Sequence, residues 1–70
     1  MMMMNNSFGK NLKRIREEKG VSQEDLAKHI HICRESVSKW ETGKVSPQVK
    51  WLYEIARFLK VNPEELVRTK

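Results

Sequence analysis

The hydrophobic residues of this chain recur three or four positions apart, in short blocks separated by residues that favour turns. Phe8, Leu12 and Ile15 have this spacing, which places them on one stripe of a helix. We therefore predict a first helix over about residues 7–19, ended by Gly20 in the left-handed conformation. Apolar and polar residues alternate nowhere for long, so the pattern predicts no strand.

Two further helices are predicted after this glycine, separated by a turn of three residues. Ser22 can cap the second helix, and Asp25 three residues later completes a capping box. This helix should end near Ile30. A third helix is predicted over about residues 34–41, followed by a loop. The inner faces of the two helices would be apolar: Leu26, Ala27 and Ile30, then Val37 and Trp40.

The last two predicted helices each begin with a capping residue followed by proline. Ser46 and Pro47 would open the fourth helix, which should run to about Leu59. Asn62 and Pro63 would open a short fifth helix in the same way, with a glutamate to complete the capping box. All five segments are helical, so the predicted fold class is all-α.

Length and charge narrow the class of protein. The 70 residues are enough for one domain, near the lower limit for an unsupported core. We interpret residues 1–6 as a disordered N-terminal tail and residues 7–70 as the single domain. Lys and Arg total 14 against 9 acidic residues, and this net charge of +5 favours an anionic partner. A basic surface that serves only solubility is the alternative.

The sequence also indicates a compartment. One cysteine excludes an internal disulfide and suits a reducing environment. No apolar run approaches the roughly 20 residues of a membrane span, and no signal peptide precedes the domain. We therefore expect a cytoplasmic protein without a membrane partner. No carboxylate pair, activated nucleophile or phosphate-binding glycine loop indicates an enzyme, and no cofactor is expected.

The second and third helices together have the geometry of a helix-turn-helix, in which eight-residue helices flank a three-residue turn. Ala27 is small where the helices would cross, and Ile30, Ile32 and Val37 would lock the crossing angle. The third helix would then project from the body of the domain. It could enter the major groove of DNA, which is about 12 Å wide.

The stretch SQEDLAKHIHICRESVSKWETGKVSP resembles the Xre/Cro/C1-type helix-turn-helix domains of phage repressors and small bacterial regulators. The resemblance covers about Phe8 to Leu66 and includes the flanking motifs LKRIREEKGVSQEDLA and LYEIARFLKVNPEEL. It implies a compact, lambda-repressor-like bundle of five helices. It also implies a prokaryotic or phage transcriptional regulator of double-stranded DNA, a repressor that binds an inverted-repeat operator as a homodimer.

In that family the second helix lies across the DNA backbone and the third reads bases from its N-terminal end. The resemblance implies that the following residues face the bases: Arg34, Glu35, Ser38, Lys39 and, at a base edge or a phosphate, Gln23. It implies that a second set binds phosphates: Ser22, Ser36, Thr42, the N–H of Gly43, and Lys44.

Several of these assignments have a simpler alternative. Arg34 and Lys39 suit the N7 and O6 acceptors of guanine, but either could instead bind phosphate or stay in solvent. Glu35 could accept from N4 of cytosine, or could only complement the dipole of the third helix. Ser36 and Ser38 could be small polar fillers. The residue types alone leave these alternatives open.

The chain departs from the family pattern at two positions and follows it at an internal ion pair. His31 stands where the turn usually carries glycine, so we expect a positive φ there. Cys33 stands where Ser, Thr or Asp usually caps the third helix, so the cap should be weak. A thiol at a helix N-terminus could also sense redox state, or be only a tolerated small residue. Arg16 and Glu41 match positions that form an ion pair in family members.

His29, His31 and Cys33 place three possible metal ligands within five residues. A structural zinc site needs four ligands, commonly in two separated pairs. The geometry of a helix followed by a turn would send the two histidines apart. We therefore expect no metal site.

The expected partners are double-stranded DNA and a second copy of the chain. By family analogy, the segment from about Asn62 would mediate self-association. Trp51 stands where the family pattern is usually small and polar, and could lie at a dimer face, beside the DNA backbone or in solvent. The alternative function is an antitoxin subunit or protein-interaction module, bound to a toxin or other protein, in which DNA binding is secondary.

Overall fold

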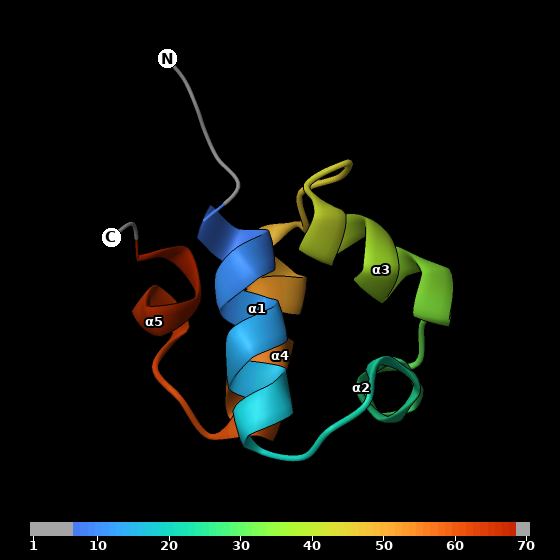
Figure 1. Cartoon of the computed structure of the whole chain (residues 1–70), viewed down its shortest axis with the longest axis horizontal. Helices are drawn as coiled ribbons and strands as arrows, with labels where there is room; N and C mark the ends of the chain where they lie inside the picture. The colour runs from blue at the N-terminus through green and yellow to red at the C-terminus, as the bar shows by residue number, and fades with distance from the viewer. Residues whose placement is uncertain (1–6, 69–70) are drawn as a thin grey trace.

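The computed structural model describes residues 7–68, which form five α-helices and no strand (Figure 1). The predicted tail over residues 1–6 and the last two residues of the predicted domain lie outside the described part. The all-α fold class is confirmed. The helices are α1 (Ser7–Glu18), α2 (Gln23–Ile30), α3 (Arg34–Thr42), α4 (Val49–Leu59) and α5 (Pro63–Val67).

The helices are arranged around α1, which crosses in front of α4 in Figure 1. α5 lies on one side of this pair, and α2 and α3 lie on the other. α1 packs against both α3 and α5, and α4 packs against both α2 and α5. The helix-turn-helix formed by α2 and α3 is therefore held from behind by the two longest helices. No helix within residues 7–68 has the length and apolar character needed to cross a membrane.

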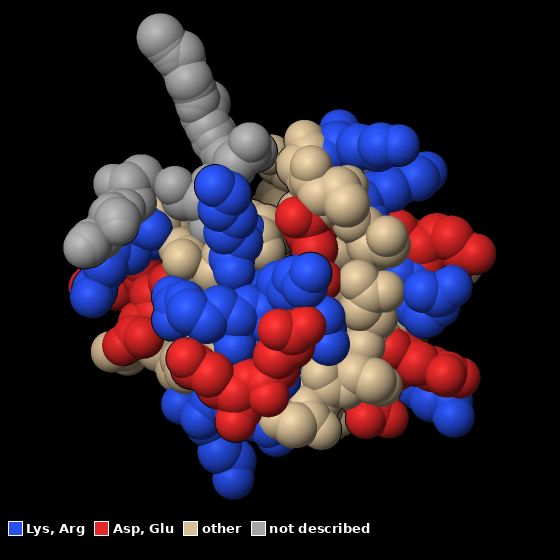
Figure 2. Space-filling model, in the orientation of Figure 1, with Lys and Arg blue, Asp and Glu red and all other residues tan. Residues whose placement is uncertain are grey.

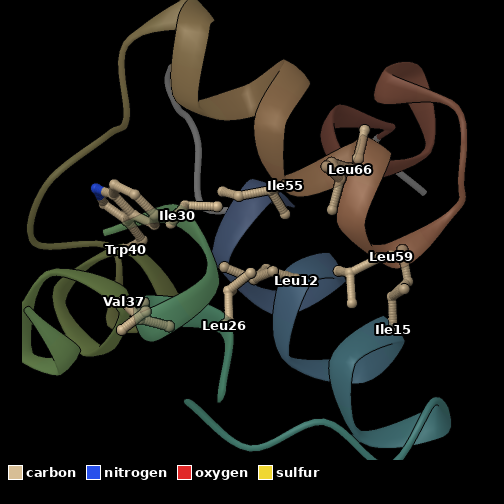
Figure 3. Packing of buried hydrophobic residues seen from close by; sticks show 11 residues of the cluster. Leu12, Ile15, Leu26, Ile30, Val37, Trp40, Ile55, Leu59 and Leu66 are labelled. Carbon is tan, nitrogen blue, oxygen red and sulfur yellow. The ribbon is translucent and has the colours of Figure 1, made fainter. Parts of the chain in front are cut away.

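The core consists of apolar side chains from all five helices, which point into the space between them (Figure 3). Every residue predicted to line the inner faces of α2 and α3 is buried, as are Leu12 and Ile15 of α1, while Phe8 packs at the edge of the core. Burying one such side chain contributes roughly 1.5–3 kcal/mol. The buried residues are Leu12, Ile15, Leu26, Ala27, Ile30, Val37, Trp40, Ile55, Ala56, Leu59 and Leu66.

The start of α2 follows its local signal. The N–H of Asp25 donates to Oγ of Ser22 at 2.9 Å, and the N–H of Ser22 donates to Oδ2 of Asp25 at 3.3 Å. The predicted capping box is therefore confirmed. α1 ends at Glu18, one residue earlier than predicted, and Gly20 has the expected positive φ of 71°.

The predicted start of α4 is wrong by two residues. The helix begins at Val49, and Gln48 rather than Ser46 occupies the cap position, without a side-chain capping bond. Pro47 is half-buried and lines a depression together with Trp40 and Trp51. The cap-and-proline pattern is a local signal, and here it does not coincide with the start of the helix.

α5 begins at Pro63, as predicted, but the contacts at its two ends differ from those expected. Asn62 occupies the cap position without a side-chain bond, so the predicted capping box is wrong. At the other end, Nδ2 of Asn11 donates to the carbonyl oxygens of Leu66 at 3.0 Å and Arg68 at 2.8 Å. A five-residue helix has more terminal groups than internal bonds, so this side chain of α1 stabilises it.

α1 approaches the end of α3 so closely that only glycine fits at position 9. A Cβ atom on Gly9 would lie 2.5 Å from the carbonyl oxygen of Trp40 and 2.6 Å from that of Glu41. Both atoms belong to the backbone and cannot rotate away. The hydrophobic pattern of α1 gave no sign of this contact.

Candidate nucleic-acid interface

The turn between α2 and α3 is closed by His31, which has the left-handed φ of 64° and ψ of 48°. Its N–H donates to the carbonyl oxygen of Lys28 at 3.3 Å, and the N–H of Ile32 donates to that of Ala27 at 2.9 Å. These bonds satisfy the last carbonyl groups of α2. The positive φ expected at His31 is confirmed, at a cost of about 1 kcal/mol relative to glycine.

Cys33 occupies the cap position of α3, and its side chain makes no capping hydrogen bond. The weak cap expected there is confirmed. The thiol is exposed, and a redox role for it stays a prediction. The N-terminal end of α3 is fixed instead by its packing against α2, because Ala27, Ile30 and Val37 are buried at the crossing and Ile32 packs against them.

The outer face of α3 brings together most of the residues predicted to contact bases. Arg34, Glu35 and Lys39 are exposed, and Ser38 is half-buried between them. A shallow depression of about 230 Å³ on this face is lined by Glu35, Ser38, Lys39, Thr42 and Lys44. The predicted base-reading residues of α3 thus share one surface with two of the predicted phosphate ligands.

Not every predicted phosphate ligand lies on this face. Ser36 lines a different depression, on the side of α3 that carries Trp40 and faces α4. Thr42 and Gly43 lie at the end of α3 and already have partners there. The hydroxyl of Thr42 donates to the carbonyl oxygen of Lys39 at 3.3 Å, and the N–H of Gly43 donates to that of Trp40 at 3.2 Å.

The charge on this side of the molecule is mixed but mainly positive on α3. Arg34 and Lys39 of α3 and Lys44 just after it are exposed, as is the carboxylate of Glu35, whereas the other carboxylate of α3, that of Glu41, is buried. Figure 2 shows basic side chains along the edge formed by α3 and α2, with acidic side chains between them. Further basic side chains face the viewer over α1, so positive charge is not confined to the predicted interface.

A buried ion pair joins α1 to the end of α3, as predicted. Nε of Arg16 donates to Oε2 of Glu41 at 2.7 Å, and Nη2 donates to Oε1 at 3.1 Å. Nη1 of Arg16 donates to the carbonyl oxygen of Val21 at 2.8 Å. Arg16 is 7% exposed and the side chain of Glu41 is 4% exposed. The positive charge of Arg16 and the negative charge of Glu41 therefore neutralise each other in the interior of the domain.

The electrostatics of this pair favour the charged guanidinium. The hydrogen bonds to Glu41 raise the pKa of Arg16 above its ordinary value, while burial acts in the opposite direction and the charge of Glu41 reinforces the increase. Arg16 therefore stays protonated throughout the working pH range of the protein. Removing one member of such a pair leaves a buried charge without compensation.

Gln23, predicted to contact DNA, lies between this ion pair and Arg34 at the start of α3. Its Nε2 donates to Oε1 of Glu41 at 3.0 Å. Its Oε1 accepts from Nη1 of Arg34 at 3.2 Å. The side chain of Gln23 thus connects a buried carboxylate to an exposed arginine at the start of α3. No local sequence signal indicates this connection, because Gln23 belongs to α2 whereas Arg34 and Glu41 belong to α3.

Trp40 and Trp51 join α3 to α4, with their ring centroids 6.5 Å apart. Trp40 is buried, and Trp51 is half-buried and packs against the core. The ammonium group of Lys50 lies 4.9 Å from the centroid of the Trp51 ring. The structure therefore places Trp51 mainly against the core, which was not among the three places considered for it, and beside the depression that Ser36 also lines.

The two histidines point to separate places. The ring of His29 stacks on Phe58 of α4, with centroids 4.0 Å apart and planes inclined by 24°. His31 is exposed in the turn. Within residues 7–68, no three side chains of His, Cys, Asp or Glu are grouped so that they could hold a metal ion.

Known proteins resemble this chain in sequence over most of its length. The sequence profile of a family described as helix-turn-helix matches residues 12–66. The chain is 37% identical over 60 residues to the HTH-type transcriptional activator BcrR of Enterococcus faecalis. That alignment covers 86% of this chain but 29% of BcrR, so the chain spans less than a third of the relative's length.

Two solved structures are similar in fold. The restriction-modification controller protein C.AhdI of Aeromonas hydrophila superimposes with a TM-score of 0.81 at 33% identity, over 86% of this chain and 91% of that one. The N-terminal DNA-binding domain of SinR of Bacillus subtilis superimposes with a TM-score of 0.85 at 25% identity, over 94% of this chain and 97% of that one.

Proposed function

Because the chain belongs to the Xre/Cro/C1-type family of helix-turn-helix DNA-binding domains, we propose that it represses transcription by binding an inverted-repeat operator as a homodimer. Membership of this family supports DNA-binding transcriptional regulation as the function of this domain. The observation that carries the proposal is the outer face of α3, where polar and basic side chains project from a helix whose other face is fixed in the core. Its place of action would be the cytoplasm of a prokaryotic cell.

Base reading would come from the exposed side of α3. Arg34 stands at the first position of the helix and would donate to N7 and O6 of a guanine. Lys39, one turn further on, would reach a second acceptor. Glu35 would accept from N4 of a cytosine, and Ser38 between them would bond a base edge of either kind. Their exposure on one surface supports this assignment.

Phosphate binding would fix the register of α3 in the groove. Lys44 is exposed and lines the depression on α3. Its ammonium group would bind a phosphate and so position the helix without reading a base. Ser22 at the start of α2 and Thr42 at the end of α3 would add hydroxyl contacts. Ser36 and the N–H of Gly43 complete the proposed set, although the latter already bonds within its helix.

The homodimer would form through α4 and α5. Tyr53 is 56% exposed and Val67 is 47% exposed, although both are large and apolar. They line a depression of about 390 Å³ with Leu52, Asn62, Pro63 and Glu64. Exposed apolar groups gathered in this way are typical of an interaction surface. The partner would be a second copy of the chain, and a toxin or other protein is the alternative.

Sedimentation equilibrium would test this assignment of the dimer surface. Tyr53→Glu should place two carboxylates at the centre of a two-fold contact and shift the chain toward monomer. The matched control is Tyr53→Phe, which keeps the apolar ring and should leave the association constant nearly unchanged. If the wild-type chain is monomeric both free and bound to DNA, the homodimer is ruled out.

Selection from random duplex DNA at low salt would test the proposed function itself. We expect enrichment of two related half-sites in inverted orientation, about 10 base pairs apart from centre to centre. If no such dyad is enriched, the proposal is rejected. A reporter gene with the selected site at its promoter would then separate repression from activation, the role that BcrR has by name.

A further inference from the structure

The outward side of α1 is formed by charged side chains. Every exposed residue between positions 8 and 18 is charged, and these five residues form the charged face of α1: Lys10, Lys13, Arg14, Glu17 and Glu18. Their spacing of three or four positions places them on one side of the helix. Other sides of α1 pack against α3 and α5. In Figure 1 α1 crosses in front of α4, and Figure 2 shows basic side chains over α1 with acidic side chains toward its C-terminal end.

The two signs of charge are separated along this face. Lys10, Lys13 and Arg14 lie in the first two turns of α1, whereas Glu17 and Glu18 end the helix. The helix dipole favours the reverse order, with acids near the N-terminus and bases near the C-terminus. The separation of charge therefore does not stabilise α1, and the helix dipole does not explain it.

The bases of this face have no acidic partner inside the protein. Both ion pairs found within residues 7–68 involve the buried Arg16, which lies 2.7 Å from Glu41 and 4.0 Å from Glu17. The guanidinium of Arg14 bonds only the neutral amide of Asn11. Most of the charge on the face is therefore available to another molecule.

Pairing within the helix does not use these charges either. Lys13 and Glu17 are four positions apart, as are Arg14 and Glu18, so each base could reach the acid one turn later. Neither pair approaches to 4.0 Å. A base that precedes the acid is also the weaker of the two orders for such a pair. The acids and bases thus remain separately exposed.

A partner for this face has to carry both signs of charge. Duplex DNA, which is uniformly anionic, would be attracted by the bases and repelled by Glu17 and Glu18. The same face of a second copy, reversed in direction, presents acids opposite the bases and bases opposite the acids. We propose that the charged face of α1 binds the charged face of a second copy of the chain in antiparallel orientation. This contact is separate from the homodimer surface proposed on α4 and α5, so it would link two homodimers.

Helix geometry determines which residues would meet. A two-fold axis between residues 15 and 16 of both helices would place Lys13 opposite Glu17 of the second copy, and Arg14 opposite Glu18 of the second copy. The members of each pair would be displaced by about 1.5 Å along the helices, the rise of one residue. Residues four positions apart lie on the same edge of the face, as this symmetry requires. Each pair would occur twice because the contact is symmetric.

The strength of this contact should depend on salt and on proximity. Exposed ion pairs each contribute little, and salt screens them. Contact through α1 should therefore be weak between free molecules. It becomes effective where two copies are already close together, as on neighbouring sites of one DNA molecule. This consequence, unlike the contact itself, rests on the proposed binding of DNA.

Two charge-exchange variants test the contact. The acidic variant carries Lys13→Glu and Arg14→Glu, and the basic variant carries Glu17→Lys and Glu18→Lys. Each variant has a face of mainly one sign, which should repel itself and attract the face of the other variant. Because each replacement changes the charge by two units, the acidic and basic variants have net charges of +1 and +9, against +5 in the wild type. Both remain positive, so net charge alone should not attract them to each other.

Titration of the isotope-labelled acidic variant with the unlabelled basic variant measures their association by nuclear magnetic resonance. At low salt we expect saturable changes in amide chemical shift, confined to about residues 10–18. The affinity of the mixed pair should exceed the self-association of either variant through α1 by at least about tenfold. Raising the salt concentration to about 0.5 M should abolish the changes.

The matched control replaces two exposed bases outside α1. Lys28→Glu with Arg57→Glu gives the same net charge of +1 but leaves the charged face intact. Titration of this control with the basic variant should give no changes in α1. Thermal unfolding shows whether Glu17→Lys disturbs the nearby Arg16. If it does, Arg14→Glu mixed with Glu18→Lys repeats the test at the Arg14–Glu18 pairs alone.

Three results would overturn the inference. The first is a mixture of the acidic and basic variants that does not associate. The second is a set of shift changes that lies outside α1. The third is an equal response of the control variant, which would assign the association to net charge. A wild-type chain that selects no DNA would reject the proposed function instead, because the antiparallel contact is measured on the free protein.

Discussion

The α2–α3 side of the molecule and the α4–α5 side differ in the contacts that their surfaces make. On the first side, Gln23 of α2 is joined to Glu41 and Arg34 of α3 by side-chain hydrogen bonds, and a capping box closes the start of α2. On the second side, neither α4 nor α5 has a side-chain cap at its start, a property that they share with α3 but not with α2. Of the large apolar residues found exposed within residues 7–68, Val49, Tyr53 and Val67 lie in α4 and α5, and none lies in α2 or α3.

This difference matches two kinds of recognition. Hydrogen bonds are directional, so a polar network fixes where the side chains of α3 point, which base reading requires. Apolar contacts are not directional and scale with the area that they bury. They suit an association surface whose partner only has to cover it. The predictions below test how far each side depends on its own kind of contact.

The largest effect should come from the ion pair that supports the polar side. Arg16→Met leaves the carboxylate of Glu41 buried without its partner, and should lower the free energy of unfolding by about 3–5 kcal/mol. The control is Arg14→Met in the same helix, where an exposed guanidinium bonds only Asn11 and the loss should stay below about 1 kcal/mol. Urea denaturation followed by circular dichroism measures both. Equal losses of unfolding free energy in the two variants would mean that the buried ion pair contributes no more to stability than an exposed arginine.

The close approach of α1 to α3 should give the next largest effect. Gly9→Ala forces a methyl group against the carbonyl oxygens of Trp40 and Glu41, and should destabilise the domain by about 1–3 kcal/mol or more. Alanine has a higher helix propensity than glycine, so propensity alone predicts that Gly9→Ala stabilises the domain. Thermal unfolding of the two proteins decides between them. An increase in Tm would contradict the packing described here.

Lys44→Ala should have a smaller effect, confined to DNA binding. Loss of one phosphate contact should weaken binding to every sequence alike and reduce the salt slope by about one. Stability should not change, because Lys44 is exposed. Titration of operator and unrelated duplex at several salt concentrations measures both quantities. A loss restricted to the operator would instead assign Lys44 to base reading.

The smallest effects should come from two left-handed residues, one on each side. His31 has φ 64° at the end of α2, and Lys60 has φ 62° at the end of α4. Glycine adopts this conformation without the steric cost of a Cβ atom. His31→Gly and Lys60→Gly should therefore each stabilise the domain by up to about 1 kcal/mol. Denaturant unfolding checks this, and a loss of stability in either would show that its side chain makes a compensating contact.

The sequence predicted correctly those features of the fold that depend on residues close together in the chain. The capping box of Ser22 and Asp25 and the apolar stripes of the helices are of this kind. The cap of α4 was predicted at Ser46 and lies at Gln48, so the cap-and-proline pattern alone placed the start of this helix two residues too early. The role of Gly9 was missed because its contact is with α3, far away in the sequence.

The candidate site divides in the same way. The outer face of α3 follows from helical spacing once α3 is recognised, so the placement of Arg34, Glu35 and Lys39 on one exposed surface could be predicted. The link from Glu41 through Gln23 to Arg34 could not. It depends on how α2 packs against α3, because Gln23 lies in α2 whereas Arg34 and Glu41 lie in α3.

The most direct test of the central claim, that α3 reads base pairs from its N-terminal end, compares the DNA selected by the wild-type chain with that selected by Arg34→Ala. We predict that the wild-type chain enriches a dyad with a preferred G·C pair in each half-site, and that Arg34→Ala enriches the same dyad without a preference at that pair. Identical motifs from the two proteins, or no motif from the wild type, would contradict the account.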